Sequence, residues 1–245
     1  MSKIKEATKP LPKLSEPLYL SEHQAVIINV CPVKNDKQLI VSFAMPCIDK
    51  YYQDKPEAIL AYLLGHEGPG SILSYLKAKH WAFRLTAGSG INGSNFKDFN
   101  ISIALTESGE KHIDKIINAV FSYLNLLQNQ PIAAHYFAEK KSIAMLSFMY
   151  QEKLKPLDSV SQYAVNMHHY PSENYIFGDY MMNKFNQPLV CELLAYFTPA
   201  NMRVIHISQN EKFQQTSKWY QVPYSIKKIS QKQLEQWQKV SHNDA

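Results

Sequence analysis

The chain has 245 residues, of which 45% are hydrophobic and 19% charged, as is typical of a globular protein with a substantial core. No apolar run is long enough to span a bilayer, and residues 1–17 lack the apolar segment of a secretory signal. The net charge of +5 comes almost entirely from lysine, because Arg84 and Arg203 are the only arginines. Proteins that read nucleic acids rely on arginine for bidentate contacts, so this composition argues against a nucleic-acid partner, and nothing predicts a membrane partner.

The N-terminal part predicts a tail followed by two strands. Residues 1–17 are rich in proline and lysine and predict a linker or tail, with one domain over residues 18–245. Two β-rich runs lie at 25–30 and 39–45, and the polar residues 34–37 between them predict a hairpin turn. Alternate residues of the second run are apolar, which is typical of a strand with one face in a core.

The next apolar run has helical spacing. Asp54 and Glu57 have the spacing of a capping box, so a helix is predicted to begin there and to run to Leu64. A stretch rich in glycine then interrupts the helical pattern. Ser71 follows this stretch and is predicted to cap a second, short helix.

The remaining elements predict the fold class. Alternating runs at 81–87 and 99–105 predict two strands separated by a loop, and apolar residues from Ser108 to Leu127 have the spacing of an amphipathic helix. The other predicted elements are a long helix over 132–154, helices after Pro156, around Met181, around Leu193 and over 230–238, and a strand at 202–208. Pairs of strands followed by blocks of helices predict an α+β fold, with a mixed, largely antiparallel sheet and helices packed on one face.

No motif for a catalytic metal or nucleophile is present. HExxH and HxxEH place two histidines on one helical face, and neither occurs in the chain. The pair His66-Glu67 is followed by Gly-Pro-Gly, which cannot continue a helix to a further ligand. The widely spaced Cys31, Cys47 and Cys191 predict buried free thiols, with a disulfide as the alternative. We therefore predict no catalytic residue and no metal ligand in this chain.

Six of the eight glycines lie between Gly65 and Gly93. Because glycine permits positive φ and close approach of another backbone, this region is predicted to have a specially shaped main chain. The predicted strand beginning at Trp81 offers backbone groups to which an extended peptide could pair, and Glu67 beside it could hold a peptide amino terminus. Ordinary turns and helix caps are the alternative explanation of the same residues.

Several segments resemble a known family. The segment "YLLGHEGPGSILSYLKAKHWAFRLTAGSG" is similar to the second domain of the M16 zinc peptidases of the insulysin and pitrilysin type. "PCIDKYYQDKPEAIL", "ISIALTESGEKHIDKII", "MHHYPSENYIFGDYMMNKFN", "FTPANMRVIHIS" and "KWYQVPYS" resemble further parts of the same domain. The resemblance extends over roughly residues 17–240, and GHEGPGS is its most specific element.

The resemblance implies a role in peptide binding. Members of the family have four related domains in two halves that enclose a chamber, with the zinc in the HxxEH site of the first domain. The second domain binds no metal and lines the chamber, so this chain is expected to be inactive alone, with zinc in the parent's first domain. Its expected partners are a peptide substrate and other M16 domains or an M16 subunit. The compartment stays open, and the exported bacterial members of the group suggest the periplasm.

The resemblance also implies an exosite that anchors the amino-terminal side of a substrate. The residues carried over by position are Tyr62, Gly65, Glu67, Leu85, Ala87 and Ser89. Tyr62 replaces a histidine and Ala87 replaces a glycine of insulysin, so an insulysin-like substrate preference does not follow. Two alternatives remain: a stand-alone pseudoenzyme subunit that pairs with an active M16 subunit, and a one-domain hydrolase with a site around His66 and Glu67.

Overall fold

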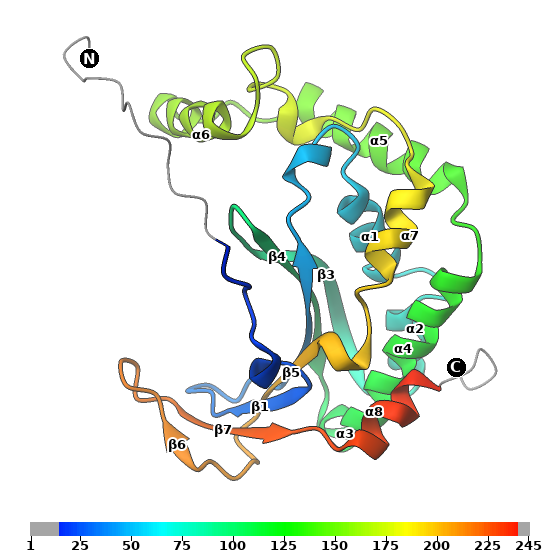
Figure 1. Ribbon diagram of the computed structural model, residues 1–245, viewed down its shortest axis with the longest axis vertical. Coiled ribbons are helices and arrows are strands. Elements are labelled where there is room, and N and C mark those ends of the chain that lie inside the picture. Colours follow the sequence, from blue (N-terminus) through cyan, green and yellow to red (C-terminus); the bar gives the residue numbers. More distant parts are fainter. Residues whose placement is uncertain (1–14, 240–245) are drawn as a thin grey trace.

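The computed structural model describes residues 15–239 (Figure 1). Residues 1–14 of the predicted tail lie outside the described residues. The helices are α1 (Pro56–Leu64), α2 (Ile72–Ala78), α3 (Glu107–Glu110), α4 (Ile113–Asn129), α5 (Ala134–Met149), α6 (Pro156–His169), α7 (Gln187–Leu194) and α8 (Gln231–Gln238). The strands are β1 (Val26–Val30), β2 (Gln38–Pro46), β3 (Ala82–Asn92), β4 (Phe96–Leu105), β5 (Met202–Ile207), β6 (Gln215–Thr216) and β7 (Pro223–Lys228). Single 3₁₀ turns lie at Ser21–His23, Asp49–Tyr51, Gly178–Tyr180 and Pro199–Asn201.

The described strands form one open sheet of seven, in the order β3-β4-β2-β5-β1-β7-β6. All neighbouring pairs are antiparallel except β1 and β5, which are parallel. β3 therefore lies at one edge and the two-residue β6 at the other. The predicted α+β class with a mixed, largely antiparallel sheet is confirmed.

The apolar alternation of the strands builds the core on one face of the sheet. Leu39, Val41 and Phe43 of β2 are fully buried and lie opposite buried residues of β4 in the antiparallel register. Figure 1 shows α1, α2, α4, α7 and α8 on this side of the sheet, and no α-helix of the described part of the chain covers the other face of the central strands. The predicted packing of helices on one face is confirmed, and each residue buried there adds roughly 1.5–3 kcal/mol of transfer free energy to folding.

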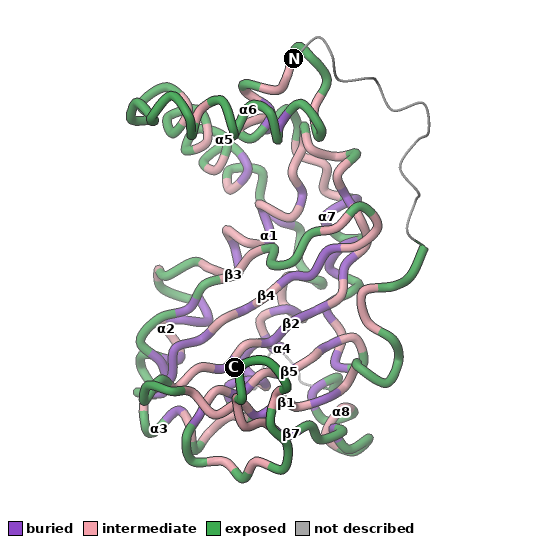
Figure 2. Tube along the Cα trace, turned by 90° about the vertical axis from the view of Figure 1, so that its left-hand side faces the viewer, coloured by how far each residue is buried: buried purple, intermediate pink, exposed green. Residues whose placement is uncertain are grey.

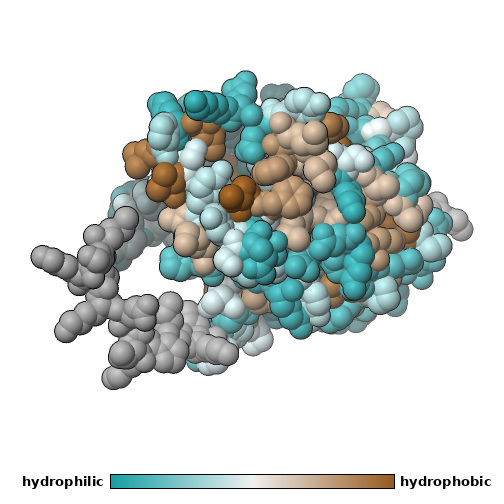
Figure 3. Space-filling view, turned by 90° about the horizontal axis from the view of Figure 1, so that it is seen from above, coloured by the Kyte–Doolittle hydropathy of each residue, from teal (hydrophilic) through white to brown (hydrophobic). Residues whose placement is uncertain are grey.

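Two helices extend away from this body. Figure 2 shows α5 and α6 as a largely exposed layer at one end of the molecule, in contrast to the buried centre of the sheet. Large apolar side chains are nonetheless exposed on them: Ile143, Met145, Leu146 and Met149 on α5, and Leu157, Val160, Tyr163, Val165 and Met167 on α6. Figure 3 views this end and shows hydrophobic atoms among hydrophilic ones on the surface. No helix in the described part of the chain is long and apolar enough to cross a membrane.

The predicted hairpin between residues 25–30 and 39–45 is wrong. Both runs are strands, but β1 pairs with β5 and β7, and β2 pairs with β4 and β5. β5 thus lies between the two strands that the short connection had suggested as neighbours. Alternation identifies a strand and its buried face, whereas the partner depends on residues far away in the chain.

Other predicted boundaries also differ. The loop predicted after residue 87 is mostly strand, because β3 continues to Asn92 and pairs with β4. α1 begins at Pro56 after Lys55, which has a φ of 44° and makes no side-chain cap, so the predicted capping box does not form. The helix predicted around Met181 is only a 3₁₀ turn that precedes it. All three cysteines are free thiols, but none is buried as predicted, since Cys31 and Cys47 are half-buried and Cys191 is exposed.

Candidate functional site

The loop between α1 and α2 brings the end of α1 close to β3. The N–H group of Gly65 donates to the carbonyl oxygen of Ala61 at 2.9 Å and ends the helix. A Cβ on Gly65 would lie 2.8 Å from that oxygen and 3.7 Å from the nitrogen of Ala87. Gly70 has a φ of +80°, a left-handed conformation that favours glycine. A side chain at Gly65 would therefore crowd the last turn of α1, and one at Gly70 would be strained by the left-handed main chain.

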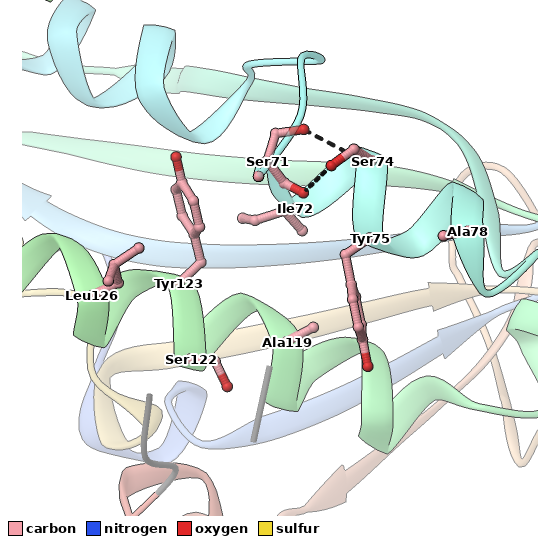
Figure 4. A pocket seen from close by; sticks show the side chains of 10 residues that line it. Ser71, Ile72, Ser74, Tyr75, Ala78, Ala119, Ser122, Tyr123 and Leu126 are labelled. Atoms are coloured by element: carbon pink, nitrogen blue, oxygen red, sulfur yellow. Dashed lines mark hydrogen bonds between the residues drawn. The ribbon is translucent and has the colours of Figure 1, made fainter. Parts of the chain in front are cut away.

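Ser71 caps the next helix, as predicted. Its Oγ accepts a hydrogen bond from the N–H group of Ser74 at 3.1 Å, and the Ser74 hydroxyl donates back to the Ser71 carbonyl oxygen at 2.9 Å (Figure 4). A serine side chain satisfies one of the N–H groups that the first helical turn leaves unpaired. The cap thus fixes the direction in which the chain leaves the loop.

β3 presents one open edge. Its main-chain pairing is with β4, and in the described residues no main-chain hydrogen bond reaches 84–89 from any other element. In an antiparallel pair, alternate residues direct their N–H and C=O groups away from the partner strand. Such an edge can accept a further strand, as the sequence suggested.

A cavity of about 470 Å³ lies where this edge meets the end of α1. It is lined by Ala61, Tyr62, Gly65, His66, Glu67, Leu85, Thr86, Ala87 and Lys140. Side chains of successive strand residues point to opposite faces, so a cavity lined by residues 85–87 lies at the strand edge itself. The structure thus brings together Tyr62, Gly65, Glu67, Leu85 and Ala87, whereas Ser89 lies farther along β3 and does not line this cavity.

Glu67 is available to a ligand. Its side chain is 65% exposed, and its Oε2 lies 3.6 Å from Nζ of Lys77, which is 48% exposed. In the described part of the chain, no backbone N–H group donates to this carboxylate, and the cap of α2 is Ser71. Helix capping therefore does not account for Glu67.

Leu85 contributes only its main chain. Its side chain is 2% exposed and belongs to the core, opposite Ile103 of β4. Any contact that Leu85 makes with a peptide therefore uses its N–H or C=O group.

Helix α5 supplies a wall of the cavity that the sequence did not predict. The hydroxyl of Tyr62 donates to Oε2 of Glu139 at 2.9 Å, and this hydrogen bond is the main cause of the raised pKa of Tyr62. Nζ of Lys140 lies 6.0 Å from the centroid of the Tyr62 ring. The two α5 residues are 77 or more positions from Tyr62, and no local pattern connects them to it.

A second cavity, of about 490 Å³, lies between α2 and α4 (Figure 4). Figure 4 shows the rings of Tyr75 and Tyr123 along it, with Ile72 and Ala119 between them. The Tyr123 hydroxyl donates to the carbonyl oxygen of Leu63 at 3.3 Å, and burial raises the pKa of Tyr123. Among residues 15–239, no charged side chain lines this cavity, so its surface suits apolar groups.

His206 is a buried structural residue. It is 4% exposed, and its Nδ1 lies 3.5 Å from Oε1 of Glu211. Burial lowers the pKa of His206, although the carboxylates of Glu211 and Glu110 act in the opposite direction. Within residues 15–239, no group of three His, Cys, Asp or Glu side chains is arranged to hold a metal ion. The described residues thus do not fit a zinc site.

Two family models match the chain. The model described as "Peptidase M16 inactive domain" matches residues 1–143, and the "Middle or third domain of peptidase_M16" matches residues 148–245. The two matches meet at the end of α5, yet strands from both lie side by side in the sheet, because β5 pairs with β1 and β2. Both matched regions therefore contribute to one fold.

Similar proteins are much longer than this chain. The chain is 32% identical over 238 residues to "Insulin-degrading enzyme-like 1, peroxisomal" of Arabidopsis thaliana, and the aligned region covers 96% of this chain and 24% of that protein. It is 32% identical over 244 residues to the insulin-degrading enzyme of Homo sapiens, and the aligned region covers 99% of this chain and 24% of that protein. The crystal structure of pitrilysin matches with a TM-score of 0.88 and 29% identity, over 93% of this chain and 24% of that one. With the inactive-domain model matching residues 1–143 of 245, the chain belongs to the M16 metallopeptidase family as a non-catalytic domain.

Proposed function

We propose that this chain is the substrate-binding, non-catalytic domain of a larger M16 zinc metallopeptidase. In this role it lines the peptide chamber and anchors the amino-terminal side of the substrate, while zinc and catalysis belong to another domain of the parent. The proposal treats residues 18–245 as one domain and residues 1–17 as a tail. The share of 24% that the chain covers in its relatives supports a parent of several such domains.

The observation that carries the proposal is the cavity at the open edge of β3. An extended peptide added to this edge would pair with the main chain of residues 85–89, in the way that β-addition binds peptides without regard to most side chains. The carboxylate of Glu67 lies at one end of this edge and is exposed. A free amino terminus placed there would meet a negative charge instead of solvent.

The other expected site residues have separate roles in this proposal. Gly65 lets α1 end beside the cavity, because a Cβ there would lie only 2.8 Å from the carbonyl oxygen of Ala61. Ala87 and Ser89 offer a strand edge with small side chains. Tyr62 forms a side of the cavity and connects it to α5 through Glu139.

Peptide binding by the 245-residue chain tests the anchor. We expect a labelled peptide with a free amino terminus to bind more tightly than its acetylated form, by about two- to five-fold, as befits an exposed ion pair. Glu67→Gln should abolish that difference while the thermal unfolding midpoint stays unchanged. Equal binding of the two peptides by the unmodified chain would overturn the proposal.

The exposed apolar surface of α5 and α6 supports a contact with another M16 domain. Groups of exposed apolar side chains on a folded protein mark interaction surfaces, and three-quarters of the relatives' length lies outside the matched region. Leu157 and Val160 of α6 are 76% and 65% exposed, so replacing both with glutamine should leave the chain's own stability unchanged. The double variant should bind the remaining M16 domains more weakly than Val33→Gln, a control whose apolar side chain is 96% exposed elsewhere. Equal binding by the double variant and the control would refute this contact.

A stand-alone subunit that pairs with an active M16 subunit is the second candidate. The same α5–α6 surface would then bind a separate polypeptide. The mass of the natural product distinguishes the two: a polypeptide about four times as long as this chain indicates a domain, and one of this length indicates a subunit.

A further inference from the structure

The cavity beside β3 contains two opposite charges that come from distant parts of the chain. Glu67 lies in the loop after α1, and Lys140 lies on α5. Among the described residues, no ion pair joins Lys140 to a carboxylate, and its neighbour Glu139 accepts the hydroxyl of Tyr62. The cavity is therefore lined by a lysine whose charge is not matched by an acidic partner of its own.

Helix α5 places Lys140 beside the ring of Tyr62. α5 is joined to α1 by the hydrogen bond between Tyr62 and Glu139, and the Tyr62 ring lies 6.0 Å from Nζ of Lys140. Lys140 is also half-buried, unlike the exposed Lys141 that follows it. Lys141 instead donates to the carbonyl oxygen of Asn183 at 3.3 Å. Of these two neighbouring lysines, only Lys140 lines the cavity.

The register of the sheet determines which side of a bound peptide meets Lys140. Leu85 and Ala87 pair with Ile103 and Ile101 of β4, which are buried on the helix-covered face. α5 packs against α1, one of the helices on that same face. A peptide paired with β3 would direct alternate side chains toward this face, so only every second position could reach Lys140.

We propose that Lys140 makes this site selective for peptides that carry an acidic side chain close to a free amino terminus. The amino group binds the carboxylate of Glu67, the main chain pairs with β3, and the acidic side chain binds the ammonium group of Lys140. This inference rests on the proposed function, because it requires a peptide on the β3 edge. It adds a substrate class that the open edge by itself does not define.

A positional series of peptides tests the inference. Each peptide has one glutamate at position 2, 3, 4 or 5 of a neutral sequence, and the reference peptide has glutamine at all of them. We expect glutamate to tighten binding by about two- to five-fold either at the even or at the odd positions, and to have little effect at the remaining positions. Lys140→Met should remove this preference, whereas Lys141→Met, which removes the same charge from the next residue, should retain it.

Charge reversal gives a gain of function that loss of folding cannot imitate. Lys140→Glu should transfer the preference from glutamate to lysine at the same peptide positions. If the unmodified chain distinguishes free from acetylated amino termini but binds the glutamate and glutamine peptides equally, the inference fails and the proposed function stands. If acetylation has no effect on any peptide, the proposed function is wrong, and the inference that rests on it is wrong as well. An unchanged glutamate preference in Lys140→Met would also overturn the inference.

Discussion

In the proposed site, the ion pair between Lys77 and Glu67 would compete with a peptide amino terminus for the same carboxylate. The two charged atoms are 3.6 Å apart, and the side chains are 48% and 65% exposed. Exposed pairs of this kind contribute about 0.2–1 kcal/mol, which corresponds to at most about a five-fold change in a dissociation constant. Lys77→Ala should therefore tighten the binding of a peptide with a free amino terminus by up to about five-fold.

Lys79→Ala is the matched control, since it also removes one positive charge. Nζ of Lys79 lies 5.6 Å from the ring of Tyr75 and forms no ion pair with Glu67. Fluorescence anisotropy with free and acetylated peptides measures the effect, which should be confined to Lys77→Ala and to the free peptide. The gain should also disappear in about 1 M salt, where the screening length is about 3 Å. Weaker binding of the free peptide by Lys77→Ala would refute the competition.

Three more results are expected. Burial lowers the pKa of His206 below 6.5, so the unfolded chain binds a proton more readily than the folded chain, and the unfolding free energy should be retained above about pH 6.5 and decrease below it. In urea unfolding, His206→Gln should show a smaller decrease at low pH, and identical pH profiles of the two proteins would contradict this. Gly109→Ala places a Cβ against the main chain of Trp81 and should lower the unfolding free energy by about 1–3 kcal/mol, which corresponds to several degrees in the thermal midpoint. In Gly88→Ala the added Cβ makes only an ordinary van der Waals contact, so the stability should not change. Ser71→Ala should cost about 1 kcal/mol through the lost cap, and Ser71→Asp should restore most of it in the same thermal measurement.

The strands of the core were predictable because each carries its own signal. Leu39, Val41 and Phe43 alternate with less buried residues, and this alternation is a local consequence of the pleat. The same signal does not specify a partner, so the sequence predicts a hairpin between the adjacent β1 and β2 that the structure does not contain. β7 was missed because only Ser225 of its six residues is fully buried, so its sequence has no apolar alternation.

The candidate site was predictable in part for a similar reason. Gly65 and Glu67 lie in a short stretch whose glycines and proline show an unusual main chain, and the family resemblance gave the strand beside it. Glu139 and Lys140 carry no such signal, because exposed charges on a helix are common and their role depends on where α5 packs. Leu85 was expected at the site from position alone, and its burial shows that only its backbone can take part.

The central position of β5 has a consequence for how the protein is made. The residues of β2, β3 and β4 have all been synthesised once the chain reaches residue 105. β5 begins only at Met202, and it pairs with the edge of β2 that faces away from β4. During synthesis, or in any fragment that ends before β5, the apolar strand β2 has an unpaired edge, and such edges invite pairing between chains. Expression fragments cut at the boundary between the two family matches, near residue 145, should therefore aggregate, whereas fragments that extend past Lys228 retain the whole sheet.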